Sequence, residues 1–266
     1  MVKLLFIGDI FGKPGRKAVK KILPQFRDDQ EFDLVIANGE NLAGGLGLTK
    51  NTANEMFDSG VDVLTSGNHL WDKRESIDFI SGAHRILKPA NYTSDVPGKE
   101  YFEFKLPGGK KLFIINLMGR TFTVNVDCPF QKINQFLEKT STFTPLIFVD
   151  FHAEATAEKK AFGWFLDGRV SAVVGTHTHV QTADERILPR GTAYITDAGM
   201  TGPHDSVIGV RIKNSITRFR QQIPNKFIAA KKNIQLQGVS IQIDETNGQA
   251  QKIKRIVLKL DNYEGN

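Results

Sequence analysis

The chain contains 266 residues, of which 40% are hydrophobic and 24% are charged, a composition that excludes a disordered or collagen-like protein. Its single cysteine, Cys128, cannot form an internal disulfide, which excludes a disulfide-stapled secreted fold and favours the reducing cytoplasm. No stretch approaches the roughly 20 apolar residues of a membrane span. We therefore expect one cytoplasmic domain over residues 1–266, without a membrane partner.

The basic charge of the chain is concentrated at its end. The formal net charge is +6 and the isoelectric point is 9.3. Residues 211–266 hold eleven Lys or Arg against four Asp or Glu, which leaves 24 basic and 25 acidic residues in 1–210. Residues 211–232 hold seven Lys or Arg and no acid, so this segment is a candidate for contact with RNA. A solvated basic face is the simpler explanation.

Short apolar runs of strand length alternate with amphipathic segments along the chain. In order, we predict strands at 3–8, 33–37 and 61–65, and helices at 14–27, 49–58 and 73–80. A hairpin at 101–106 and 111–117 follows, then a helix at 130–139, a strand at 146–151, a helix at 156–166 and a strand at 170–174. Two antiparallel strands, 234–243 and 252–260, close the chain. The alternation predicts an α/β fold, and the hairpins predict mixed sheets.

Polar side chains gather directly after the predicted strands. The groups are Gly8-Asp9, Asn38-Gly39-Glu40-Asn41, Gly67-Asn68-His69, His152 and the pair His177 and His179. In open α/β sheets, ligands bind beyond the carboxyl ends of the strands, so these loops should converge on one edge.

Each of these residues also has an ordinary structural explanation, as a helix cap, a turn or a surface residue. However, four of the six histidines fall at predicted strand ends. In extended backbone His177 and His179 would point to the same side. The set offers seven nitrogen or oxygen donors and no thiolate, which suits two cations such as Fe, Mn or Zn. These donors are Asp9, Glu40, Asn41, Asn68, His152, His177 and His179, and a carboxylate such as Glu40 could bridge two metals.

These motifs resemble those of a known enzyme superfamily. Gly8-Asp9, Gly67-Asn68-His69 and the sequence GTHTH at 175–179 resemble the GD, GNH and GHTH elements of the calcineurin-like metallophosphoesterases. Residues 8–16, 38–41, 150–154 and 200–203 are similar to the YmdB-type bacterial phosphodiesterases, a branch whose likeness extends over nearly the whole chain. The broader family opens with Asp-x-His, whereas position 11 is Phe here. The YmdB-like branch shares that departure, and Asn41 fills the place of the missing donor.

The resemblance implies a four-layer α/β/β/α sandwich with two mixed sheets, of the metallo-dependent phosphatase type. It implies two divalent metal ions, Fe or Mn with Zn as an option. One ion would be held by Asp9, Glu40, Asn41 and His179, and the other by Glu40, Asn68, His152 and His177. Glu40 would bridge them, and His69 would lie beside both as the proton donor.

The implied activity is hydrolysis of phosphate esters, with 2',3'-cyclic nucleotides as the first candidate substrates, by in-line attack of a hydroxide that bridges the metals. The metal ligands alone do not separate this phosphodiesterase from a phosphomonoesterase or protein phosphatase of the same superfamily. A basic nucleic-acid-binding or scaffold protein is the alternative from another class. The sequence predicts no oligomeric state.

Overall fold

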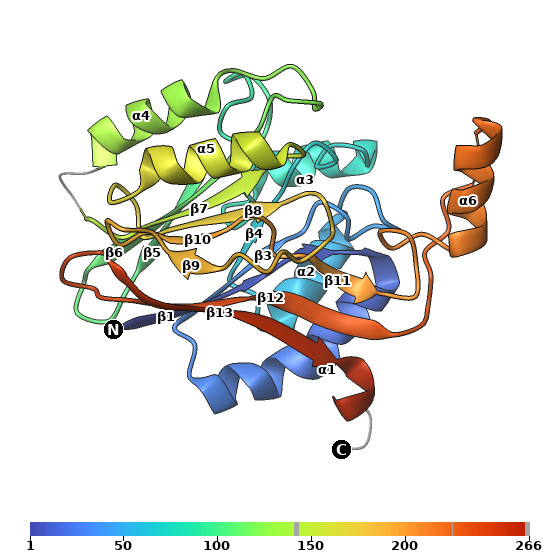
Figure 1. The fold of residues 1–266 in the computed structure, drawn as a ribbon, viewed down its shortest axis with the longest axis horizontal. Helices are drawn as coiled ribbons and strands as arrows, with labels where there is room; N and C mark the ends of the chain where they lie inside the picture. The colour runs from blue at the N-terminus through green and yellow to red at the C-terminus, as the bar shows by residue number, and fades with distance from the viewer. Residues whose placement is uncertain (141–143, 225, 264–266) are drawn as a thin grey trace.

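Two β-sheets lie face to face in the computed structural model, and helices cover their outer faces (Figure 1). The structure describes residues 1–140, 144–224 and 226–263. The apolar runs predicted from the sequence form the strands, and the amphipathic segments between them form the helices.

The first sheet is mixed. Its strands are β1 (Val2–Ile7), β2 (Asp9–Ile10), β3 (Leu34–Asn38), β4 (Val63–Thr65), β11 (Met200–Pro203), β12 (Ile234–Ile243) and β13 (Ala250–Lys259). They follow the order β2-β11-β12-β1-β3-β4, and β13 pairs with β12. β1, β3 and β4 run parallel, whereas β12 runs antiparallel to β1. The carboxyl ends of β1, β3 and β4 therefore share one edge of the sheet.

The second sheet repeats this arrangement. Its strands are β5 (Tyr101–Lys105), β6 (Lys111–Met118), β7 (Ile147–His152), β8 (Ala172–Thr176), β9 (Arg186–Ile187) and β10 (Ala193–Ile195), in the order β5-β6-β7-β8-β10-β9. β6, β7, β8 and β10 are parallel, and antiparallel β5 and β9 close the two edges.

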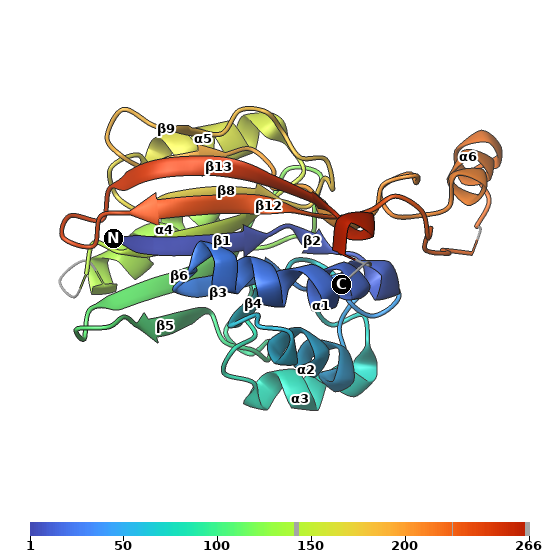
Figure 2. The ribbon, with the colours of Figure 1, turned by 90° about the horizontal axis from the view of Figure 1, so that it is seen from below.

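The helices lie on both sides of the paired sheets. They are α1 (Gly12–Gln30), α2 (Lys50–Asp58), α3 (Ile77–Gly82), α4 (Pro129–Thr140), α5 (Thr156–Leu166) and α6 (Ile212–Gln221), with short 3₁₀ turns at Arg74–Ser76 and Leu260–Tyr263. α1 and α2 cover the first sheet, and α4 and α5 cover the second (Figures 1 and 2). This confirms the predicted four-layer sandwich.

Three apolar cores hold the layers together. The central core lies between the sheets, where the rings of Phe6 on β1 and Phe148 on β7 stack with centroids 5.4 Å apart. A second core joins the first sheet to α1 through Val19 and Ile22, and a third joins the second sheet to α5 through Phe162. Because each sheet is covered on both faces, its central strands are apolar throughout, which explains the continuous apolar runs in the sequence.

The predicted hairpin and the final antiparallel pair are both confirmed, and β12 joins the first sheet beside β1. The predicted helix at 73–80 begins as a 3₁₀ turn and becomes α-helical only from Ile77. The sequence pattern did not predict β9, β10, β11 or α6, because these elements are short or lack a long apolar period.

α6 stands apart from the layers in both views, at the end of an arm (Figures 1 and 2). It lies within the basic segment 211–232, and only Ser215 of the helix is buried. The base of the arm joins the body near Phe11, whose ring lies 6.2 Å from that of Phe227.

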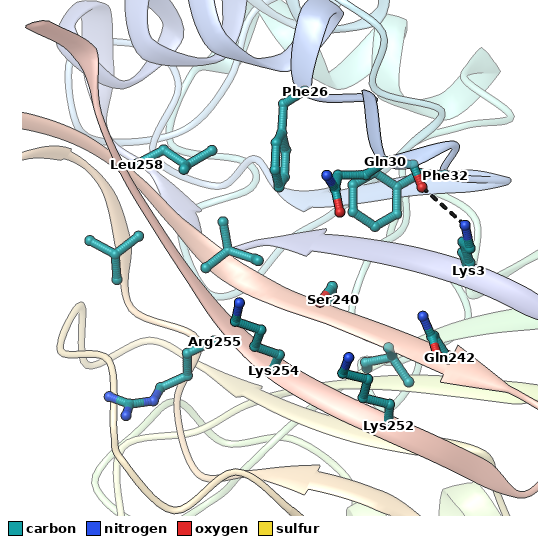
Figure 3. A pocket seen from close by; sticks show the side chains of 13 residues that line it. Lys3, Phe26, Gln30, Phe32, Ser240, Gln242, Lys252, Lys254, Arg255 and Leu258 are labelled. Carbon is teal, nitrogen blue, oxygen red and sulfur yellow. Dashed lines mark hydrogen bonds between the residues drawn. The ribbon is translucent and has the colours of Figure 1, made fainter. Parts of the chain in front are cut away.

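A groove of about 600 Å³ opens on the outer face of the first sheet, beside the end of α1 (Figure 3). Phe26 and Phe32 form one wall, and Lys252 and Lys254 lie along its floor (Figure 3). Because β13 pairs only with β12 among the described strands, these lysines lie on an edge strand, where positive charge opposes pairing with another chain. Lys3, near the start of β1, also lines the groove, whereas Asp9 follows the other end of that strand.

Among the described residues, no helix is both long enough and apolar enough to cross a membrane. That residues 1–266 form one domain stays a prediction.

Candidate metal centre

The seven predicted donors come from both sheets and lie at the carboxyl ends of parallel strands. Asp9 begins β2, Glu40 and Asn41 follow β3, and Asn68 follows β4. His152 ends β7, and His177 and His179 follow β8. The edges of the two sheets therefore bring together residues from distant parts of the chain.

Glu40, His152 and His177 form the centre of the site. His152 Nε2 lies 3.1 Å from Glu40 Oε1 and 3.0 Å from His177 Nδ1. The donor atoms of all three residues lie within 4.8 Å of one another, a spacing that can hold a metal ion. The Glu40 and His152 side chains are fully buried, so their polar atoms need partners inside the protein.

Asp9, Asn41 and His179 form a second group of contacts. His179 Nε2 is 3.2 Å from Asn41 Oδ1 and 3.9 Å from Asp9 Oδ1. Asp9 Oδ2 accepts a hydrogen bond from the backbone N–H of His177 at 3.2 Å, which joins the two groups. The division of these residues into two ligand sets stays a prediction.

Two buried oxygens of the site have no hydrogen-bond partner among the described residues: Asp9 Oδ1 and Asn68 Oδ1. A buried carboxylate or amide oxygen left without a partner is costly, and native proteins avoid it. A divalent cation would satisfy both atoms, since carboxylate and amide oxygens are ordinary ligands of hard metals. The residues present therefore fit a metal site.

The close approach of the donors depends on Gly67. A Cβ atom at this position would overlap His152 Nε2 and Glu40 Oε2. Glycine is thus required here because two donor atoms occupy the space that any side chain would fill.

The ring of His152 is held from behind by a buried hydrogen-bond chain. Its Nδ1 lies 2.9 Å from Thr176 Oγ1, and the Thr176 hydroxyl donates to Asp150 Oδ1 at 2.7 Å. Because the hydroxyl proton is used on Asp150, the Thr176 oxygen accepts the Nδ1–H of His152. Nε2 is then the nitrogen that faces the site, as a metal ligand requires.

The other two histidines are oriented in the same manner. His177 Nε2 lies 3.2 Å from Glu154 Oε2, which leaves Nδ1 facing the site. His179 Nδ1 lies 3.1 Å from the carbonyl oxygen of Ile208, which leaves Nε2. Both residues have positive φ, 105° for His177 and 64° for His179, a strained conformation that is frequent at functional sites.

Burial and mutual charge shift the pKa values of the central residues. Burial would raise the pKa of Glu40, but the charge and the hydrogen bond of His152 outweigh it and lower that pKa to about 2. Burial would lower the pKa of His152, but Glu40 raises it to about 9. Burial and the charge of His152 lower the pKa of His177 to about 3, so its ring is neutral. Glu40 and His152 form an ion pair, and a bound cation would displace the His152 proton.

His69 lies beside the cluster rather than within it. Its backbone N–H donates to Glu40 Oε2 at 3.2 Å, while its ring is partly exposed and Nδ1 lies 2.7 Å from Asp72 Oδ2. This pairing orients the ring and leaves Nε2 available to a bound molecule.

Sequence reasoning did not identify the residues that support the ligands. These are Asn38, whose Oδ1 accepts from the Glu40 N–H, together with Asp150, Glu154, Thr176 and the carbonyl of Ile208. The sequence DFHAE at 150–154 could have indicated the roles of Asp150 and Glu154. Acids two residues before and after a candidate ligand at a strand end are well placed to support it.

Comparison with known proteins agrees with this geometry. The model of the family described as "YmdB-like protein" matches residues 5–256. The chain belongs to the YmdB-like family. This YmdB-like chain is 48% identical over 260 residues to a 2',3'-cyclic-nucleotide 2'-phosphodiesterase of Bacillus subtilis, and the match covers 98% of each chain.

Two solved structures are also similar to this YmdB-like chain. A hypothetical protein from Thermus thermophilus is 38% identical, with a TM-score of 0.91, and the match covers 97% of this chain and 99% of that one. A novel phosphatase of Mycoplasma pneumoniae is 34% identical, with a TM-score of 0.92, and the match covers 97% and 93%. The resemblance drawn from the motifs is thereby confirmed for this YmdB-like chain.

Proposed function

We propose that this chain is a metal-dependent phosphodiesterase that hydrolyses 2',3'-cyclic nucleotides. The observation that carries the proposal is the buried cluster of N and O donors, in which Asp9 Oδ1 and Asn68 Oδ1 have no partner among the described residues. The extended similarity to the Bacillus subtilis phosphodiesterase supports the choice of substrate.

Two divalent cations fit the donor set. Asp9, Glu40, Asn41 and His179 would hold one, and Glu40, Asn68, His152 and His177 would hold the other. When bound, such cations supply positive charge for the phosphate oxygens and lower the pKa of water that attacks phosphorus. Fe and Mn are our first choices and Zn the next, since all three accept this mixture of imidazole and oxygen ligands.

His69 is the proposed proton donor. Hydrolysis forms a bond between water oxygen and phosphorus and breaks the bond from phosphorus to a ribose oxygen, which leaves with a negative charge unless it is protonated. His69 stands at the rim of the cluster with Nδ1 held by Asp72 and Nε2 available. A protonated His69 can therefore give its Nε2 proton to the leaving oxygen.

The test is metal analysis of the purified protein, paired with assays on 2',3'-cyclic nucleotides, 3',5'-cyclic nucleotides and phosphomonoesters. We expect two equivalents of metal and a preference for the 2',3'-cyclic substrates. Asp9→Asn and His177→Ala should abolish the activity. Preference for monoesters would favour the phosphatase alternative, which the similarity to the Mycoplasma pneumoniae phosphatase supports. Activity that survives removal of metal would contradict the proposal.

A second proposal concerns RNA contact through 211–232. Its support is the basic composition of the segment and the exposed position of Arg218 and Arg220 on the projecting α6. We expect single-stranded RNA to bind with an affinity that falls steeply with salt, and Arg218→Glu with Arg220→Glu to weaken it without loss of catalysis. RNA affinity that is unchanged in this double variant would favour a solvated basic face. We place the protein in the cytoplasm, in keeping with its single cysteine.

A further inference from the structure

The loop formed by residues 119–127, here named the β6 loop, begins directly beside the candidate metal centre. It leaves the carboxyl end of β6, where Met118 pairs with His152 in register. The backbone N–H of Gly119 donates to the carbonyl oxygen of His152 at 3.0 Å. Because three residues extend at most about 10 Å, Phe122 lies within that distance of Gly119, which is itself bonded to the backbone of the candidate ligand His152.

The two ends of the β6 loop are fixed by one buried side chain. Asn91 Nδ2 donates to the carbonyl oxygens of Met118 and Asp127, each at 2.8 Å. Asn91 Oδ1 accepts from the Met118 N–H at 2.9 Å, and the Asp127 N–H donates to the Asn91 carbonyl at 2.9 Å. The loop is therefore closed at its base.

A second set of bonds braces the loop on α5. Glu158 accepts hydrogen bonds from the backbone N–H groups of Arg120 at 2.9 Å and Thr121 at 3.0 Å. A Cβ atom at Gly119 would lie 2.6 Å from Ala153 Cβ and 2.7 Å from Glu158 Oε2, so the close approach requires glycine there. The backbone of the loop is thus anchored by hydrogen bonds up to Thr121.

Phe122, in the middle of the loop, belongs to none of the apolar cores formed by the described residues. Its side chain is 88% exposed, the highest value among the large hydrophobic residues described. Its φ is 62°, in the left-handed region that a bulky residue rarely adopts. An exposed aromatic ring and a strained backbone both cost free energy, and strain of this kind is kept where the surrounding structure enforces it for a purpose. The braced loop is the structure that enforces it.

We propose that Phe122 is the platform on which the base of a nucleotide substrate stacks. The inference rests on the proposed function, because it takes the phosphate to lie at the metal centre. A nucleobase offers a flat π-face to an aromatic side chain, and such stacking is tolerant of base identity. A ring held on a braced loop loses little freedom when a base stacks on it. The enzyme would then accept all four bases and prefer nucleotides to phosphate esters without a base.

The experiment compares Phe122→Ala with the wild-type enzyme on two substrates: a 2',3'-cyclic nucleotide, and the matched ribose 2',3'-cyclic phosphate in which a methoxy group replaces the base. For the nucleotide we expect kcat/KM to fall about 10-fold to 100-fold, mainly through KM. For the base-free substrate we expect less than about a twofold change, because it has no base to stack. Phe122→Tyr should retain wild-type values, and Val124→Ala, at another exposed apolar position of the loop, should leave both substrates unaffected.

A direct measurement of nucleotide binding distinguishes the stacking role of Phe122 from the proposed phosphodiesterase function. The affinity for a 3'-mononucleotide is measured by calorimetry in wild type and in Phe122→Ala, both carrying metal. If the wild type binds the nucleotide but hydrolyses no cyclic phosphate, and the variant loses binding, the proposed function fails and the stacking role stands. Equal losses on both substrates, or unchanged nucleotide affinity in Phe122→Ala, would overturn the stacking role. A wild-type protein that binds no nucleotide would overturn it as well.

Discussion

Thr176 Oγ1 lies 2.9 Å from His152 Nδ1, so a neutral threonine determines which nitrogen of this histidine faces the donor cluster. We expect Thr176→Val, which is similar in shape and lacks the hydroxyl, to lower metal affinity about 10-fold to 100-fold. Thr176→Ser should restore it, because serine keeps the oxygen. Calorimetric titration of the metal-free protein with Mn²⁺ measures the effect. Equal affinity in wild type and Thr176→Val would show that the hydroxyl does not orient the ring.

His69 and the ligand histidines should respond differently to substitution. His69 lies outside the cluster and pairs with Asp72, so His69→Gln should reduce kcat by about 10²-fold to 10⁴-fold while metal content stays at the wild-type level. His152→Gln, by contrast, should lose metal. The two readouts are turnover and metal content of the same preparations. A loss of metal in His69→Gln would place this residue among the ligands instead.

Removal of metal should destabilise the fold. Asp9 and Glu40 are both fully buried, and burial raises the pKa of Asp9 even though the charges of His179 and His152 oppose this shift. A cation that binds only the folded state at about 100 times its Kd adds about 2.7 kcal/mol of stability. We therefore expect chelation to lower the thermal unfolding midpoint and abolish activity, and added Mn²⁺ to restore both. An unfolding midpoint that is insensitive to chelator would contradict a buried metal site.

Gly67→Ala tests the spacing of the donors. The new methyl group would overlap His152 Nε2 and Glu40 Oε2, so these atoms must separate and metal affinity should fall at least about 10-fold. Gly82→Ala is the matched control, because a Cβ at Gly82 meets no atom within 4 Å. Metal titration and circular dichroism of both variants distinguish loss of the site from loss of the fold. Wild-type affinity in Gly67→Ala would show that the donors adjust freely.

Asp184 provides a pH-dependent contribution to stability outside the site. Burial would raise its pKa, but hydrogen bonds from the Thr196 and Thr182 hydroxyls and from the Thr196 N–H lower it below the ordinary value. A carboxyl whose pKa is lower in the folded state stabilises the fold above its unfolded pKa of about 3.9, and this stabilisation disappears as the pH falls through the folded value. Asp184→Asn should therefore be less stable than wild type at neutral pH.

Urea unfolding of both proteins between about pH 3 and pH 7 measures this difference. The gap between the two free energies of unfolding should narrow toward low pH. A gap that is constant over this range would show that the carboxylate charge of Asp184 contributes nothing.

The sequence predicted the part of the site that depends on strand ends. Asp9, Glu40 and His152 follow apolar runs that are plain in the sequence, and the carboxyl ends of parallel strands must share an edge. The sequence did not predict the short strands β9 to β11 or the arm that carries α6, because these elements depend on contacts with distant parts of the chain. β11, for example, is held by pairing with β2 and β12.

The role of Thr176 could not be predicted, for a related reason. Thr176 contacts His152 and Asp150 from the neighbouring strand β8, and this contact depends on a register that the sequence does not state. The exposure of Phe122 could not be predicted either, because an isolated phenylalanine in a polar stretch is compatible with a buried or an exposed position.

The pairing of β1 with both β3 and β12 has a consequence for the nascent chain. Residues 2–7 are synthesised more than two hundred residues before their partners at 238–243. His179, the last of the donors, also precedes β12. Because domains fold as units, the first sheet closes only after β12 has been made, and a ribosome that stalls between His179 and β12 holds a chain with every donor but without this strand pairing. Acquisition of metal should therefore follow the synthesis of β12, well after the last donor has been made.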